Sequence, residues 1–314
     1  MRSWFFLFSC NLLWALQFTC IKLVQDQVGS LFTVWGPITL AMILLYPLVR
    51  AERRRSPPQG KRSRKDVFLY LKLVLFGAFP AQILLTWGTR MSSASDAALL
   101  MLTIPVCTAV LAYFLLGERM TNVRWFSFGL AIVGVLLCSD FNFGSLNFGK
   151  GFALGNLLVF SGAVGSAFYN SYGKKALERY SPMEMLYYTY VMMFFLLTPL
   201  FFYEERDVVG RVAYFTLRTW TGLILLGVFI YFLSMVLFLT ALKDLDAIQA
   251  GLCNYLVTLF GVPIAVIWLG ERLTFMTVIG GVLVLASTLA VTVWDELRKH
   301  ARNAPPAHPP PESV

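Results

Sequence analysis

The chain has 314 residues, of which 58% are hydrophobic and only 14% charged, with a mean hydropathy of +0.68. Soluble domains are already about half apolar, so this excess excludes a soluble globular protein and predicts a lipid bilayer as solvent. Only helices and closed barrels satisfy their backbone hydrogen bonds in hydrocarbon, and no stretch alternates with a period of two. We therefore expect an all-α integral membrane protein.

Ten apolar stretches, each close to the roughly 20 residues that cross a bilayer as a helix, follow one another along the chain. The first contains polar Asn11 and Gln17 and lacks a small-x-small cleavage site, so we expect an uncleaved span rather than a secretory signal. The proline-rich tail, 295–314, is expected to be disordered and cytoplasmic. In chain order the predicted spans are 3–24, 30–49, 67–87, 94–116, 122–139, 151–173, 183–203, 218–240, 247–269 and 275–294.

The loop 50–66 carries eight Lys and Arg residues and sets the orientation, because positive residues stay on the cytoplasmic side. With this loop inside, both termini are cytoplasmic and 18 basic residues lie inside against 7 outside, with Lys72 within a span. The net charge of +9 is mostly this loop, so we predict contact with the lipid bilayer and none with nucleic acid. A bacterial inner membrane is the expected location.

The sequence LLGERMTN at 115–122 returns as WLGERLTF at 268–275, and neighbouring residues also match at offsets of 153 and 152. This predicts a duplicated five-helix unit. Since five is odd, the second copy enters the membrane inverted, as in many secondary transporters. The expected organisation is 1–139 as the first repeat, 140–150 as a linker, 151–294 as the second repeat and 295–314 as the tail.

The repeated motif is expected to form a structural turn on each face of the membrane rather than a ligand site. Gly117 suits the left-handed end of a helix, and Thr121 suits the N-cap of the next one. Glu118 is expected to stabilise the positive N-terminus of that same following helix. The same three roles are predicted in the second copy for Gly270, Thr274 and Glu271.

The two GER turns, at half-length spacing in a ten-span chain, resemble the EamA family of the drug/metabolite transporter superfamily over about residues 3–294. The resemblance implies a 5+5 inverted-topology repeat that exports small metabolites. It also implies a central cavity lined by the first, third, fourth, sixth, eighth and ninth spans, with the fifth and tenth peripheral. It does not define a substrate.

Polar side chains at mid-depth in a span are candidate binding residues, since they are costly in hydrocarbon. Asn11, Trp14 and Gln17 share one side of the first predicted helix, and Asn254 breaks the small-residue pattern that the fourth and ninth spans share. Packing between helices is the alternative explanation for each. Tyr169 and Asn170 are expected in an interfacial belt instead. The candidate substrate-binding residues are Asn11, Trp14, Gln17, Gln82, Tyr231, Asn254, Tyr255 and Thr258.

Three prolines within spans, Pro80, Pro105 and Pro263, each remove a backbone hydrogen bond and are predicted to form kinks or hinges beside the cavity.

The spans contain no Asp or Glu at mid-depth, which disfavours proton antiport and a cationic substrate. We expect uniport of small neutral or zwitterionic, amino-acid-like metabolites by alternating access. Proton-coupled drug or cation efflux is the alternative. A sugar-phosphate or nucleotide-sugar antiporter is another alternative, but Lys72 alone, without an arginine partner, supports it weakly, and snorkelling toward the cytoplasm explains this lysine better.

An enzyme is not expected, because no span carries a histidine or a pair of carboxylates. The five cysteines lie within apolar runs, and two histidines are too few to build a metal centre, so we expect no cofactor and no metal site. A non-transporting membrane scaffold stays open as an alternative. Gly129, Gly134, Gly280 and Gly281 in the fifth and tenth spans could support a homodimer as well as internal packing.

Overall fold

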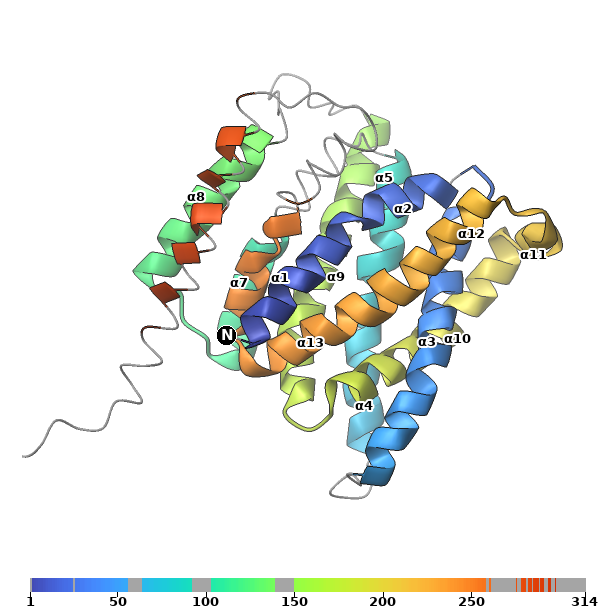
Figure 1. Ribbon diagram of the computed structural model, residues 1–314, viewed down its shortest axis with the longest axis horizontal. Helices are drawn as coiled ribbons and strands as arrows, with labels where there is room; N and C mark the ends of the chain where they lie inside the picture. Colours follow the sequence, from blue (N-terminus) through green and yellow to red (C-terminus); the bar gives the residue numbers. More distant parts are fainter. Residues whose placement is uncertain are drawn as a thin grey trace, which may run out of the picture.

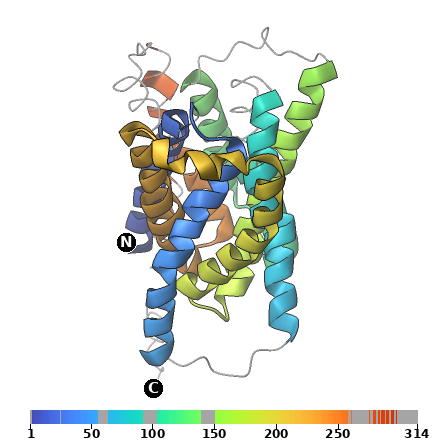
Figure 2. The ribbon, with the colours of Figure 1, turned by 90° about the vertical axis from the view of Figure 1, so that its right-hand side faces the viewer.

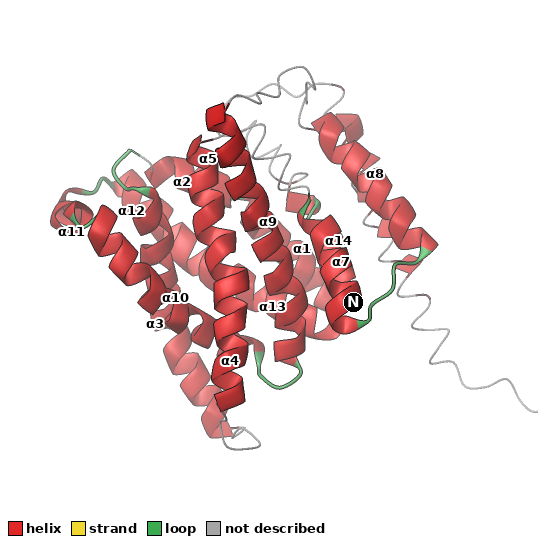
Figure 3. Cartoon of the chain, turned by 180° about the vertical axis from the view of Figure 1, so that it is seen from behind, coloured by secondary structure: helices red, strands yellow, loops and turns green. Residues whose placement is uncertain are grey.

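The computed structural model describes residues 2–24, 26–55, 64–91, 103–138 and 150–257, together with short pieces between 260 and 297. Every regular element in these described parts is helical (Figure 3). In chain order the elements are α1 Arg2–Ala15, α2 Gln17–Val24, α3 Ser30–Arg55, α4 Arg64–Leu73, the π-helical η1 Val74–Ala78 and η2 Pro80–Leu84, α5 Leu85–Met91, α7 Ile104–Leu116, α8 Asn122–Cys138, α9 Lys150–Leu177, α10 Pro182–Glu204, α11 Asp207–Arg211, the 3₁₀ helix η4 Val212–Tyr214, α12 Leu217–Ile224, the π-helical η5 Leu225–Ser234, α13 Met235–Asp244 and α14 Ala247–Cys253.

Four of the described helical segments are long and apolar enough to cross a membrane: Ser30–Arg55, Asp66–Gly88, Pro182–Glu204 and Leu217–Asp244. Large apolar side chains also cover the outside of the bundle, as at Phe114, Phe195 and Phe126, which are 76%, 71% and 67% exposed. A soluble protein rarely presents such continuous apolar surface to water. The chain is an all-α integral membrane protein.

Helix bounds differ from the predicted spans in two informative places. The first predicted span, 3–24, is two helices, because α1 ends at Ala15 and α2 begins at Gln17. The third, 67–87, and the eighth, 218–240, are each longer and contain π-helical turns in mid-course. Positions 92–102 and most of 258–300 lie outside the described residues, and so do parts of the fourth, ninth and tenth predicted spans.

Several helices pack around the segment α12–η5–α13. α3 lies against both α10 and η5, and α1 lies along α13 (Figures 1 and 2). α9 packs against α5 and α7 on the other side of the bundle. α8 stands at the edge of the molecule in the views of Figures 1 and 3. One face of α12–η5–α13 is therefore buried against several elements, while Ile224 and Phe229 on it stay exposed.

Side-chain hydrogen bonds join helix ends and loops at two opposite ends of the bundle. At one, called here the Arg53 end, Arg53 Nη2 donates to Glu184 Oε1 at 2.6 Å, and Ser3 Oγ donates to Asp244 Oδ2 at 2.7 Å. At the other, called the Gln27 end, Gln27 Oε1 accepts from the Thr216 backbone N–H at 2.9 Å. Arg53, Glu184, Ser3 and Asp244 thus lie at the end that the sequence predicts to be cytoplasmic.

Candidate functional site

The break in the first helix lies between two candidate residues. Leu16 joins α1 to α2 in a tight turn, its N–H donating to the Leu13 carbonyl at 3.1 Å rather than to the carbonyl four residues back. Trp14 and Gln17, both half-buried, flank this turn. Discontinuous helices commonly form the binding sites of secondary transporters, because the break exposes backbone groups at membrane depth.

A second interruption occurs in the ninth predicted span. α14 ends at Cys253, and Asn254 and Tyr255 form a turn in which the Asn254 N–H reaches the Gly251 carbonyl at 3.1 Å. This three-residue spacing tightens the backbone relative to an α-helix. Both interruptions therefore coincide with residues that the sequence indicated as candidates for binding.

The π-helical turns contain two more candidates. Pro80 is the first residue of η2, where its missing N–H leaves the preceding carbonyls without their usual partner, and Gln82 lies in the same segment. Tyr231 lies in η5. Inserted π turns frequently mark functional sites, since they shift side chains out of helical register.

A hydrogen bond joins these two π-helical segments. The Tyr231 hydroxyl donates to Gln82 Oε1 at 3.1 Å, and the Tyr190 hydroxyl of α10 donates to the backbone carbonyl of Tyr231 at 2.6 Å. Tyr231 and Tyr190 are 6% and 4% exposed, so these bonds lie in the interior. Three helices distant in sequence are thereby connected through Tyr231.

Three polar atoms on neighbouring helices are buried without a hydrogen-bond partner among the described residues: Asn11 Oδ1, Thr108 Oγ1 and Asn254 Oδ1. α14 packs against both α1 and α7, which carry Asn11 and Thr108. Asn11 and Thr108 are 0% exposed, and Asn11 uses its amide nitrogen to reach the Leu7 carbonyl at 2.7 Å. Buried polar atoms are normally paired, so each of these three requires an explanation.

Thr108 was not among the sequence-based candidates. It belongs to the small-residue stripe of the predicted span 94–116, where a hydroxyl does not stand out from alanines. Its side chain faces α14, since a Cβ added to Gly251 would lie 3.3 Å from the Thr108 Cβ. This close approach of two helices brings Thr108 next to the Asn254 turn.

Trp14 and Tyr255 pack against aromatic neighbours. The Trp14 ring lies 5.0 Å from Phe238 of α13, and Tyr255 meets Phe128 of α8 edge to face at 6.2 Å. Tyr255 is 1% exposed. Tyr255 therefore contacts the peripheral helix α8, and its role in binding stays a prediction.

Several predicted residues have other positions. Pro105 lies in the first turn of α7, where a missing N–H costs no intrahelical bond. Positions 92–102 lie outside the described residues, so a kink at Pro105 stays a prediction. Tyr169 and Asn170 are 6% and 7% exposed, so their assignment to an interfacial belt was wrong. Thr258, Pro263, Gly270, Glu271 and Thr274 lie outside the described residues.

The first GER turn has a defined local geometry. Gly117 ends α7 with φ 69°, a left-handed conformation that a residue with a side chain rarely adopts. Thr121 Oγ1 accepts from the Arg124 N–H at 3.3 Å and so caps the first turn of α8. The turn sits at the Arg53 end, beside the start of α14.

Glu118 does not stabilise the following helix, as the sequence suggested, but the first turn of α14. Its Oε1 and Oε2 accept from the backbone N–H groups of Ala247 and Ile248 at 2.9 and 3.0 Å. Local sequence could not reveal this, since the partners are 129 and 130 positions away. The positive end of a helix dipole favours a carboxylate wherever it comes from.

Charged groups surround this contact. Arg124 Nη2 bonds Asp246 Oδ2 at 2.6 Å, and Lys174 Nζ donates to the Leu242 carbonyl at 3.3 Å and to the Leu245 carbonyl. Burial raises the pKa of the Glu118 carboxyl above its ordinary value, outweighing the hydrogen bonds from Ala247 and Ile248. The carboxylate therefore lies in a partly desolvated cluster.

Among the residues that the structure describes, no three His, Cys, Asp or Glu side chains gather closely enough to hold a metal ion. The polar groups at the site are amides and hydroxyls, which suit hydrogen bonding to a solute rather than metal ligation or proton transfer.

Comparisons with known proteins agree with this arrangement of helices. A solved crystal structure superposes with a TM-score of 0.72 at 14% identity, covering 93% of this chain and 98% of the other, which establishes a shared fold. The uncharacterized transporter YetK of Bacillus subtilis is 22% identical over 91% of this chain and 84% of its own length. A probable terminal-alkyne amino-acid exporter of Streptantibioticus cattleyicolor is 26% identical over 88% of this chain and 89% of its own length.

The family comparison covers nearly the whole chain. The model of the EamA-like transporter family matches residues 1–139 and 153–293. Together with the transporter relatives, this match indicates a non-enzymatic membrane transporter of the drug/metabolite transporter superfamily. The chain belongs to the EamA-like transporter family.

Proposed function

We propose that this protein exports small neutral or zwitterionic, amino-acid-like solutes by alternating access, as a uniporter. The observation that carries the proposal is Asn11 Oδ1, a fully buried amide oxygen without a hydrogen-bond partner among the described residues. The exporter of Streptantibioticus cattleyicolor, named for an amino-acid substrate, supports the substrate class at 26% identity.

The chemistry of the site suits such a solute. Asn11 Oδ1 and Asn254 Oδ1 can accept hydrogen bonds from an ammonium or amide group, and the Thr108 hydroxyl can donate to a carboxylate. Leaving a buried polar atom unpaired costs about 1–3 kcal/mol, which a solute that pairs with it would recover. Gln82 and Tyr231 offer a further amide and hydroxyl, which now satisfy each other.

Two features support a 5+5 inverted repeat behind this mechanism. The π-helical turns begin at Val74 and Leu225, 151 positions apart, close to the repeat offsets seen in the sequence. The family match likewise consists of two ranges, 1–139 and 153–293. Inverted repeats rock about a central site, and helices interrupted at that site are their usual binding elements. Location in a bacterial inner membrane, with both termini cytoplasmic, completes the proposal.

Uniport is supported by the positions of the acidic residues. In the described part of the chain, every Asp and Glu lies in a connection or within about one turn of a helix end. The groups that meet at the interruptions are amides, hydroxyls and aromatic rings, none of which exchanges protons near neutral pH. Solute flux should therefore not depend on a proton gradient.

The test is flux in proteoliposomes that contain the purified full chain. Neutral amino acids, aromatic amino acids and lipophilic cations are compared, with and without a proton gradient. We expect saturable flux of a neutral solute without the gradient, reduced at least tenfold by Asn11→Ala and by Asn254→Ala. Asn122→Ala, at an exposed asparagine that begins α8, is the matched control and should leave flux unchanged.

Two results would contradict the proposal. Flux that requires a proton gradient, or that occurs only with cations, would favour coupled efflux. Wild-type flux in both Asn11→Ala and Asn254→Ala would show that these two amides do not bind the solute. A third variant, Thr108→Val, keeps the shape of the side chain while deleting its hydroxyl, so a loss of flux there would reflect hydrogen bonding rather than packing.

A further inference from the structure

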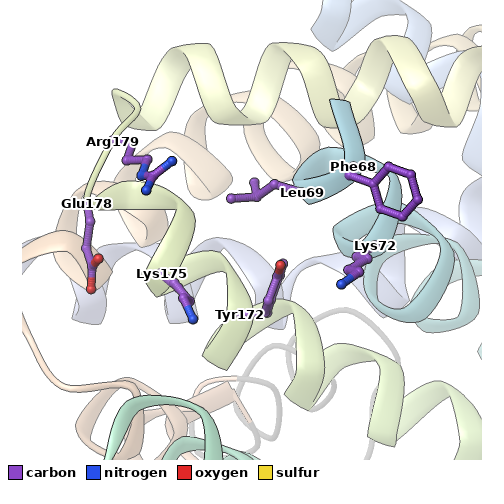
Figure 4. A pocket seen from close by; sticks show the side chains of 7 residues that line it. All are labelled: Phe68, Leu69, Lys72, Tyr172, Lys175, Glu178 and Arg179. Atoms are coloured by element: carbon purple, nitrogen blue, oxygen red, sulfur yellow. The ribbon is translucent and has the colours of Figure 1, made fainter. Parts of the chain in front are cut away.

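A hollow of about 490 Å³ lies at the Arg53 end, between the later part of α4 and the last turns of α9 (Figure 4). Three cationic side chains line it: Lys72 from α4, Lys175 from α9, and Arg179 from the turn that follows α9. Glu178 is the one carboxylate among the lining residues. The lining thus carries an excess of positive charge.

The cations lie on different elements around the opening. Figure 4 places Glu178 beside Arg179 at one side of the hollow, and Lys72 at the opposite side near Phe68 and Tyr172. Lys72 Nζ lies 6.0 Å from the centre of the Phe68 ring. Lys72, Lys175 and Arg179 are all exposed, so their ammonium and guanidinium groups are available to a ligand.

The hollow also borders the lipid-facing surface. Phe68, which lines it, is 63% exposed, and the exposed apolar side chains continue along the same helix at Leu75 and Phe76, 41% and 62% exposed. Lys72 is eight residues into α4, which is roughly 12 Å along the helix axis. The cations therefore lie where an apolar surface meets a charged end, the level at which phospholipid headgroups are found.

We propose that this hollow binds the phosphate group of an anionic phospholipid from the surrounding bilayer. Arg179 supplies a guanidinium fork that matches two phosphate oxygens, and Lys72 and Lys175 supply compact charges around it. Phe68 and Tyr172 provide apolar surface for the glycerol and the first acyl carbons. The chemistry would also suit a soluble phosphate ester, and the experiment separates the two sources. This inference does not depend on the transported solute.

A second hollow at the same end has different electrostatics. It lies between α3 and α10 and is lined by Arg50, Arg53, Arg54 and three tyrosines, among other residues. Its Arg53 is already bonded to Glu184 at 2.6 Å and donates to the Tyr188 hydroxyl. Part of its positive charge is therefore neutralised within the protein. The hollow between α4 and α9 is for this reason the better site for a phosphate group.

Lipid retention by the purified full chain tests the proposal. The protein is equilibrated with mixed micelles of phosphatidylglycerol and phosphatidylcholine, and bound lipid is counted by native mass spectrometry. We expect wild type to retain phosphatidylglycerol over phosphatidylcholine, and the double variant Lys72→Gln/Arg179→Gln to retain at least fivefold less phosphatidylglycerol. Glu178→Gln should retain more than wild type, because it removes the competing carboxylate.

The matched control is Lys243→Gln, which removes an exposed lysine at the same end, outside the hollow. It should retain as much phosphatidylglycerol as wild type. An equal loss in Lys243→Gln, or no loss in Lys72→Gln/Arg179→Gln, would overturn the proposal in favour of non-specific charge attraction. Displacement of the lipid by millimolar glycerol phosphate, sensitive to the same double variant, would instead overturn the lipid source and identify a soluble phosphate ester as the ligand.

Discussion

Two glutamates at opposite ends of the bundle perform the same local task in different surroundings. At the Arg53 end, Glu118 accepts hydrogen bonds from the first turn of α14 at 2.9 and 3.0 Å. At the Gln27 end, Glu205 accepts from the N–H groups of Leu31 and Phe32, in the first turn of α3, both at 2.9 Å. Both carboxylates come from distant parts of the chain and satisfy backbone N–H groups that the helix itself leaves free. At α14 this adds to a local capping box, in which the Asp246 N–H donates to Gln249 Oε1 at 2.9 Å.

Their neighbours differ. Glu118 lies beside the Arg124–Asp246 ion pair and Lys174. Glu205 lies instead against the backbone of Gly29, where an added Cβ would come within 2.3 Å of its carboxyl group. One cap is thus embedded in charges, while the other requires a residue without a side chain.

Both contacts connect the two ranges that the family model matches. Glu118, in 1–139, caps a helix of 153–293, and Glu205, in 153–293, caps a helix of 1–139. Reciprocal contacts of this kind hold the two ranges together at both ends. Five experiments sharpen the comparison, from the largest expected effect to the smallest.

Arg124→Leu should cause the largest loss, about 2–3 kcal/mol in the free energy of unfolding, because it leaves Asp246 without its partner. The Arg124 side chain is 7% exposed and Asp246 44%, so the pair is only partly screened by solvent. Unfolding in mixed micelles with increasing SDS, followed by circular dichroism, measures this. Arg206→Leu is the matched control: its 4.0 Å pair with Asp207 is 78% and 89% exposed and should contribute nothing measurable.

Glu118→Ala and Glu205→Ala should each lower the free energy of unfolding by about 1–2 kcal/mol, since each deletes two charge-assisted hydrogen bonds to backbone N–H groups. The same unfolding measurement applies. A loss for one variant and none for the other would show that only one carboxylate acts as a cap.

Gly29→Ala should reproduce Glu205→Ala, with a loss of about 1 kcal/mol, because the new Cβ displaces a flexible carboxylate rather than backbone. The double variant should be no less stable than either single variant, since both remove one interaction. Gly210→Ala, where an added Cβ meets nothing within 4 Å, is the control and should be neutral or slightly stabilising. If the losses in unfolding free energy of the two single variants add in the double variant, Gly29→Ala does not act through the Glu205 cap.

Thr121→Ala should cost about 0.5–1 kcal/mol, the usual value of an N-cap hydroxyl. Thr216→Ala, which removes the cap of α12, should cost more, because Thr216 Oγ1 also donates to Gln27 Oε1 at 3.1 Å. Thermal unfolding of both variants in one detergent measures the difference. Equal midpoints would mean that the Gln27 contact adds nothing.

The smallest effect is a pH dependence at Glu118. Desolvation raises its folded-state pKa above the ordinary value of 4.5. Protonated Glu118 therefore contributes stability that is fully present below pH 4.5 and is lost as pH rises through the folded-state pKa. Asp246, Arg124 and Lys174 face this group. Glu118→Gln removes the titration, so its melting temperature should fall less than that of wild type between about pH 4.5 and 7. Parallel curves would contradict the prediction, and Glu205→Gln serves as the comparison.

Part of the candidate site was predictable because its signals are local. Asn11 and Asn254 are polar residues in apolar runs, and hydrocarbon makes such residues conspicuous. The break at Leu16 was not predictable, since neither proline nor glycine occurs there. Thr108 escaped notice because a threonine among alanines satisfies helix packing equally well. The hollow at Lys72 needed Arg179, which lies 107 positions further along the chain.

The sequence by itself determined the solvent, the helical class and the family, because apolar content and a repeated turn are properties of the chain read in order. It also predicted the left-handed Gly117 and the Thr121 cap, which depend on adjacent residues. Tertiary structure decided which groups meet: Glu118 with α14 across 129 positions, and Tyr231 with Gln82 across 149. Those pairs depend on how helices cross, and helix crossing is set by side-chain packing over the whole bundle rather than by any local pattern.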